Sequence, residues 1–265
     1  MARKVGIGLI RWLLPLAVLA VVGFFAYEMI ESPGNQLFGK TLVSGPVDAK
    51  VVALTYDDGP NPPYTNAILD VLKREHVHAT FFLVGEAVDA FPGVVQREAR
   101  EGNALGNHTW EHEHLIVRSR AQVRESLLAT DAAIYRAAGI HTHIMRPPYG
   151  GRDWLVLQEA QGLGYTPVMW SVPLARDWEY PPGAVIAARI LKYVGDGSII
   201  VLHDGNRGII CGRAGVARHI CDRGSDVAAT QTIVETLKRR GYRFVTIPEL
   251  IDLRGATRKR APGTE

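Results

Sequence analysis

The sequence lacks several features that would otherwise direct its interpretation. Only two cysteines, Cys211 and Cys221, occur among its 265 residues, and two thiols alone would leave half of a structural zinc site unfilled. No internal repeat is visible, and a formal net charge of +3 is too slight to indicate a nucleic-acid partner. Nothing implies a protein partner. With 47% hydrophobic and 22% charged residues, the composition is typical of a globular protein with one large domain or two small ones.

The first thirty residues differ from the rest. Residues 5–27 carry one charge, Arg11, in an otherwise apolar stretch that lies between a signal-peptide core and a full membrane span. No A-x-A cleavage site follows. We expect an uncleaved single-pass anchor in the cytoplasmic membrane over residues 1–30, with the N-terminus inside, a linker over 31–48 and an extracytoplasmic domain. A buried core helix is the alternative, but a polar Pro/Gly segment would separate it from the domain.

Beyond the linker, strand-like apolar runs alternate with segments of helical periodicity. Strands are predicted at 51–58, 79–84, 104–106, 143–146, 165–170, 198–202 and 243–247, and helices at 64–75, 92–101, 120–138, 153–162, 183–194 and 228–240. Such alternation predicts an α/β domain, over residues 49–253, with a parallel sheet and with its chemistry at the carboxyl ends of the strands. Periodicity alone does not separate an open sheet from a barrel. A basic, disordered tail is expected over 254–265.

Charged or imidazole side chains follow five of the predicted strands: Asp57 with Asp58, His108 with His112, Arg146, Asp177 and His203. An isolated Asp-Asp-Gly is usually an ordinary turn, and a lone histidine after an apolar strand is usually a core residue. A solvated rim would rarely contain this set by chance. Because neighbouring side chains of a strand point to opposite sides, one carboxylate could bind a metal while the other transfers protons.

His108 and His112 are four residues apart in the motif HTWEH. On a helical turn both imidazoles would project from one face, as a shared metal requires, although many helical histidine pairs are only surface residues. Asp58 would complete a set of two histidines and one carboxylate that leaves a coordination position open for water and substrate. This set predicts one divalent metal, with Zn²⁺ favoured over Co²⁺ or another ion. His114 would lie on the wrong side of this helix.

The motifs TYDDGPNPPYT, ATFFLVG, GNHTWEH, RPPYG, VLHD and GYRFVTIPEL follow one another over residues 51–250. In this order they resemble the polysaccharide deacetylase family, the NodB-homology carbohydrate esterases of family 4. The resemblance implies a distorted (β/α) barrel, usually with seven strands. It also implies metal-dependent hydrolysis of N-acetyl groups in a polysaccharide that contains N-acetylglucosamine, such as peptidoglycan or a chitin-like glycan.

The resemblance also assigns roles to residues. Asp57 matches the general base, His203 the general acid and Arg146 the arginine that orients the base. The metal ligands would be Asp58, His108 and His112, and the backbone N–H of Tyr149 matches the oxyanion donor. The physical requirements agree, because amide hydrolysis needs a polarised carbonyl, an activated water and a proton for the departing amine.

Two segments depart from the family pattern. Where the family usually has W-S-V-D-x-R-D-W, residues 170–178 read WSVPLARDW, with Pro173 in place of the acid. We expect Asp177 to pair with His203 or with Arg146, and Trp178 to contact substrate together with Tyr149 and Pro148. The segment 206–225 is longer than usual and could shape the substrate groove, pinned by a disulfide between Cys211 and Cys221.

Three functions fit these observations. The first is an N-deacetylase acting on an envelope glycan outside the membrane. The second is an O-acetyl esterase acting on xylan or another acetylated glycan. The third is a catalytically silent glycan-binding module, suggested by the altered segment around Pro173.

Overall fold

The computed structural model describes residues 13, 15–25, 30, 32–173 and 175–260. The predicted membrane anchor therefore falls in large part on residues outside the described ones. Residues 15–25 are helical and expose apolar side chains such as Leu19 and Phe25. No helix in the described part of the chain has both the length and the apolar character to cross a bilayer.

A parallel sheet forms the centre of the domain, as predicted. In the described residues it has seven strands in the order β5-β4-β3-β2-β1-β6, and β7 pairs with the start of β1. The strands are β1 (Val51–Asp57), β2 (Thr80–Leu83), β3 (Ala104–Asn107), β4 (Ile144–Met145), β5 (Thr166–Pro167), β6 (Ser198–His203) and β7 (Arg243–Phe244). The strands β4 and β5 are short, and Pro167 has no N–H to offer the ladder.

The sheet is curled into a partial barrel. After β5 the chain returns toward β6, where the Ser171 N–H donates to the Ile199 carbonyl at 3.1 Å and the Ile199 N–H donates to Ser171 Oγ at 3.0 Å. These bonds bridge the two ends of the strand order. The arrangement corresponds to the barrel alternative and not to an open, doubly wound sheet.

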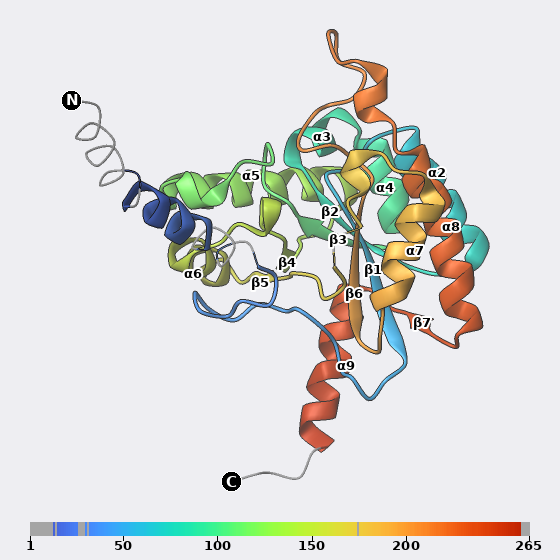
Figure 1. Ribbon diagram of the computed structural model, residues 1–265. Helices are drawn as coiled ribbons and strands as arrows, with labels where there is room; N and C mark the ends of the chain where they lie inside the picture. Colours follow the sequence, from blue (N-terminus) through green and yellow to red (C-terminus); the bar gives the residue numbers. More distant parts are fainter. Residues whose placement is uncertain (1–12, 14, 26–29, 31, 174, 261–265) are drawn as a thin grey trace, which may run out of the picture.

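Helices cover the outside of the curled sheet (Figure 1). They are α2 (Tyr64–Glu75), α3 (Gly85–Ala90), α4 (Pro92–Arg100), α5 (Arg120–Ala138), α6 (Trp154–Gly162), α7 (Gly183–Tyr193) and α8 (Gly224–Arg239). A further helix, α9 (Ile247–Arg260), follows β7 and extends away from the sheet. The longest, α5, has clear signals at both ends. Ser119 Oγ and the Gln122 side chain form a capping box, and Gly139 ends the helix at φ 72°.

β1 divides the apolar core into two parts. Val52, Leu54 and Tyr56 face outward into the cluster that includes residues of α2, α7 and α8. Val51 and Ala53 face the interior of the curled sheet, together with residues of the neighbouring strands and of α9. Because side chains alternate along a strand, Asp57 continues the inward-facing row to the carboxyl end of β1.

The C-terminal prediction needs a correction. The helix α9 continues to Arg260, so a disordered tail beginning at Arg254 is wrong for residues 254–260. Arg, Lys and Ala, which make up five of these seven residues, are strong helix formers. Residues 261–265 lie outside the described part of the chain. The short helix α3 was also not predicted.

Candidate active site

The carboxyl ends of the strands surround a cavity of about 170 Å³. It is lined by Asp57, Asp58, His108, His112, Pro147, Tyr149, Gly150, Trp170, Trp178, Val201, His203, Asn206, Arg207 and Arg223. The proposed base, acid and metal ligands therefore meet at one place, although they come from segments as far apart as β1 and β6. Their meeting follows from the register, because Asp57 is the direct neighbour of His203 on the adjacent parallel strand.

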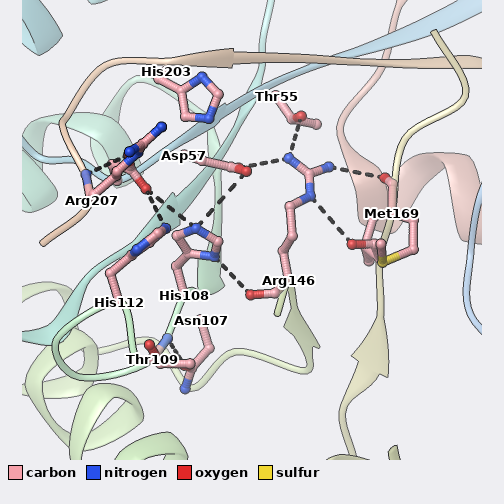
Figure 2. A network of polar contacts seen from close by, with 12 residues as sticks. Thr55, Asp57, Asn107, His108, Thr109, His112, Arg146, Met169, His203 and Arg207 are labelled. Carbon is pink, nitrogen blue, oxygen red and sulfur yellow. Dashed lines mark hydrogen bonds and ion pairs between the residues drawn. The ribbon is translucent and has the colours of Figure 1, made fainter. Parts of the chain in front are cut away.

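Arg146 holds the Asp57 carboxylate in place. Its Nη1 lies 2.6 Å from Asp57 Oδ1 and also donates to Thr55 Oγ1 at 2.8 Å (Figure 2). The remaining nitrogens donate to the carbonyls of Val168 and Met169. The guanidinium is fully buried and all its nitrogens are bound, so it is a rigid, permanent positive partner for Asp57.

Asp58 leaves the strand geometry that the alternation argument assumed. Its φ is 77°, a left-handed conformation that is uncommon for a residue other than glycine or asparagine. This turn brings its carboxylate into the same cavity as that of Asp57, where simple alternation predicts opposite sides. The Arg207 N–H donates to Asp58 Oδ2 at 2.7 Å and fixes the carboxylate from the other side.

The prediction that HTWEH forms a helical turn is wrong. His108 and His112 lie in the loop after β3, and Thr109 and His112 have φ values of 69° and 58°. Asn107 supports this loop, because its Oδ1 accepts the Thr109 N–H at 2.9 Å (Figure 2). Loop geometry, and not the helical i, i+4 relation, brings the two imidazoles to the same side, with ring centres 5.0 Å apart.

The donor set of Asp58, His108 and His112 fits a divalent metal. His108 Nδ1 lies 2.7 Å from the Arg146 carbonyl, which can only accept, so Nδ1 carries the proton and Nε2 presents a lone pair in the neutral ring. Asp58 Oδ1 lies 3.4 Å from this Nε2 and 3.1 Å from His112 Nε2, yet it has no hydrogen-bond donor. The three residues are buried and offer ligand atoms within 4.8 Å of one another, an arrangement that fits a metal ion.

Asp177 pairs with His203 and not with Arg146, which resolves the two predicted alternatives. Its Oδ2 accepts from His203 Nδ1 at 2.8 Å and from the His203 backbone N–H at 2.9 Å. Burial alone would lower the pKa of His203, but the negative charge of Asp177 and its hydrogen bond outweigh it and raise the pKa to about 9, with smaller contributions from Asp58 and Asp57. The imidazole is thus held in its protonated form.

Aromatic side chains form the walls of the cavity. Trp178 lies edge-on to His203 at 5.7 Å, and Tyr149 lies edge-on to His112 at 4.6 Å. His114, expected to lie near the metal ligands as a surface or supporting residue, stacks on the Tyr149 ring at 3.8 Å. Pro148 was predicted to contact substrate, but it is buried and does not line the cavity, whereas Pro147 does.

The segment after β6 contributes groups that the sequence did not reveal as site residues. Asn206, Arg207 and Arg223 line the cavity, and so does Trp170 from the motif after β5. The high arginine content of residues 205–225 was the only signal in the sequence that pointed to the first group. The predicted disulfide between Cys211 and Cys221 is confirmed. It closes the loop that projects beyond the strand ends, orange in Figure 1.

Arg152 is a further residue that sequence patterns do not reveal. It is 1% exposed, and its Nη1 and Nη2 donate to the carbonyls of Ile30, Ser32, Pro33, Asn35 and Gly150. No carboxylate pairs with it among the described residues. The linker before β1 is thereby fastened to the loop that carries Tyr149.

Comparisons with known proteins agree with this geometry. The family model described as polysaccharide deacetylase matches residues 44–168. A peptidoglycan-N-acetylglucosamine deacetylase of Listeria monocytogenes is 36% identical over 201 residues, which are 76% of this chain and 39% of the relative. A peptidoglycan-N-acetylglucosamine deacetylase of Bacillus cereus is 34% identical over 208 residues, 78% of this chain and 90% of that relative.

A solved structure extends the similarity to the fold. The crystal structure of the Bc1960 peptidoglycan N-acetylglucosamine deacetylase, in complex with a hydroxamate-type benzamide, matches with a TM-score of 0.70 and 35% identity. The match covers 79% of this chain and 92% of that one. The predicted family is therefore confirmed: the chain belongs to the polysaccharide deacetylase family.

Proposed function

We propose that the chain removes N-acetyl groups from a glycan that contains N-acetylglucosamine, with peptidoglycan as the substrate. The observation that carries the proposal is the meeting of a three-residue metal-binding set, the Arg146–Asp57 pair and the Asp177–His203 pair around one cavity. The relatives named as peptidoglycan deacetylases support the choice of substrate.

Each pair has a distinct task in this proposal. Asp57, fixed by Arg146, accepts the proton of the attacking water, and His203, charged beside Asp177, donates a proton to the departing amine. A divalent cation held by Asp58, His108 and His112 would polarise the acetyl carbonyl and make water more acidic at neutral pH. Zn²⁺ suits these ligands best. The Tyr149 backbone N–H is proposed to stabilise the oxyanion.

The altered segment around Pro173 gives little support to the hypothesis of a catalytically silent binding module. Pro173 is exposed and does not line the cavity, while Asp177 and Trp178 of the same segment are in place.

For location, we propose that residues 1–30 anchor the chain in the cytoplasmic membrane and hold the domain outside. The apolar side chains exposed along residues 15–25 support this.

Acetate release from peptidoglycan, N-acetylglucosamine oligomers and acetylxylan tests the proposal. We expect release from the first two that stops with chelator, returns with Zn²⁺ and is lost in Asp57→Asn. The exposed residue Asp48 gives the matched control Asp48→Asn. Release that survives both chelator and Asp57→Asn contradicts the mechanism. Release from acetylxylan alone, retained in His203→Ala, would favour the O-acetyl esterase, because an alcohol departs with less help from an acid.

A further inference from the structure

Arg207 places a positive charge at the catalytic cavity that the proposed mechanism does not use. The two arginines that line this cavity differ in their partners. Arg223 is 1% exposed, donates from Nε to the Gly205 carbonyl, and has Nη1 4.0 Å from Asp226 Oδ2. Arg207 is exposed, and within the described residues its guanidinium has no hydrogen-bond acceptor and no carboxylate within ion-pair distance. Its charge is therefore free to act on a ligand.

The backbone of Arg207 is held firmly although its side chain is free. Arg207 has φ 47°, and its N–H donates to Asp58 Oδ2 at 2.7 Å. The next residue, Gly208, has φ 74° and lies so close to the HTWEH loop that a Cβ there would be 2.6 Å from the Glu111 carbonyl. The backbone that carries the Arg207 guanidinium is thus fixed beside the proposed metal ligand Asp58. This limits the positions at which an anion can pair with the guanidinium.

The chain that follows Arg207 is also rich in arginine. Arg213 and Arg218 are exposed on the disulfide-closed loop, and Asp222 is the one carboxylate between Arg207 and Arg223. Arg213 is partly neutralised by Glu86 at 3.3 Å. The segment from Arg207 to Arg223 therefore carries more positive than negative charge, which favours anions over cations as its ligands.

Neutral chitin offers an arginine only hydroxyl and amide groups. A glycan with carboxylates offers a planar anion that matches the guanidinium fork and accepts two hydrogen bonds from it. We propose that Arg207 binds a carboxylate on the glycan near the N-acetyl group that is removed, and so selects acidic glycans over neutral ones. This inference rests on the proposed function and names its substrate class: glycans that carry lactyl or peptide carboxylates.

The test compares three substrates with the full, metal-loaded chain. They are a neutral N-acetylglucosamine tetramer, a peptide-free peptidoglycan fragment with lactyl carboxylates, and the same fragment with peptide stems. We expect Arg207→Gln to lower the ratio of acidic to neutral kcat/KM about fivefold, the effect of one exposed charged pair. Added salt should reduce the same ratio in the unchanged protein. A loss confined to the peptide-bearing fragment would place the carboxylate on the peptide.

Two controls make the result decisive. Arg218→Gln removes a charge from the same loop but not from the cavity lining, so it should lower the ratio much less than Arg207→Gln does. Arg207→Lys should restore part of it. An unchanged ratio in Arg207→Gln, or equal losses on neutral and acidic substrates, overturns the inference. Calorimetric binding of the acidic fragment, measured without turnover in Asp57→Asn and in Asp57→Asn with Arg207→Gln, separates the two proposals. Arg207-dependent binding without acetate release in the unchanged protein contradicts the proposed function alone.

Discussion

Replacing Asp177 by Asn should change the pH dependence of activity in a calculable way. The substitution leaves an oxygen that can accept the His203 Nδ1–H but removes the negative charge. With Asp177 in place, the pKa of His203 is about 9, so nearly all of the imidazole is protonated at about pH 7.5. Without that charge, burial is opposed only by the charges of Asp58 and Asp57, and the pKa of His203 should return toward its ordinary value of 6.5. Roughly a tenth of the acid then remains at the same pH, and kcat/KM should fall about tenfold.

The assay is the pH profile of acetate release between roughly pH 5 and pH 10 with saturating metal. The proton on His203 is needed for the departing amine, so activity is lost as the pH rises through the pKa of His203. The descending limb should therefore move to lower pH in Asp177→Asn. Asp57, Asp58 and a bound cation face His203 both in the unchanged chain and in Asp177→Asn, so they affect the two pH profiles alike. The prediction is therefore the difference in pH between the two descending limbs. A descending limb at the same pH would refute the assignment of His203 as the acid.

Two further substitutions test the walls and the support of the cavity. Trp178→Ala should raise KM about fivefold or more with a smaller effect on kcat, because a stacked sugar loses about 1 kcal/mol of contact; the exposed Trp154 gives the control Trp154→Ala. Arg152→Met removes the donors to five carbonyls, and we expect a loss of about 2 kcal/mol in urea unfolding. It should also lower kcat, and Arg152→Lys should recover part of both. Full kcat in the Met variant would show that the linker does not position the Tyr149 loop.

Sequence reasoning was most accurate where local signals are strong. The bounds of α2 and α5 were predicted as they are found, because apolar periodicity marks both helices and Gly139 ends α5. Strands β4 and β5 are shorter than their apolar runs suggest. An apolar run shows which residues are buried, but the hydrogen bonds between strands end earlier, where the chain turns and where Pro167 has no N–H to donate.

The geometry of the site itself could be predicted only in outline. The residues at the strand ends were identified, yet the left-handed conformations of Asp58, Thr109 and His112 have no local sequence signal. These conformations depend on contacts between distant segments, such as the bond from the Arg207 N–H to Asp58. Arg152 was missed for a similar reason, because four of its five carbonyl partners lie more than a hundred positions away in the chain.

Asp58 combines three features that destabilise the protein on their own: a left-handed backbone, a buried carboxylate and an oxygen without a donor. Its neighbour Asp57 is neutralised by a fixed arginine, whereas Asp58 faces two imidazole nitrogens. Asp58→Asn should retain the bond from the Arg207 N–H, accept the left-handed conformation readily and place an amide donor toward His112 Nε2. In chelator at about pH 8 we therefore expect this variant to be about 1 kcal/mol more stable to urea than the unchanged chain.

Added Zn²⁺ should reverse that order. A ligand that binds only the folded chain stabilises it, so the unchanged protein should become the more stable of the two, while Asp58→Asn should neither respond to the metal nor release acetate. Asp48→Asn should behave like the unchanged chain under both conditions. If Asp58→Asn were instead the less stable protein in chelator, the carboxylate would have to be stabilising through the neighbouring imidazoles alone. Asp58 would then have a structural role in the fold and would not be a metal ligand.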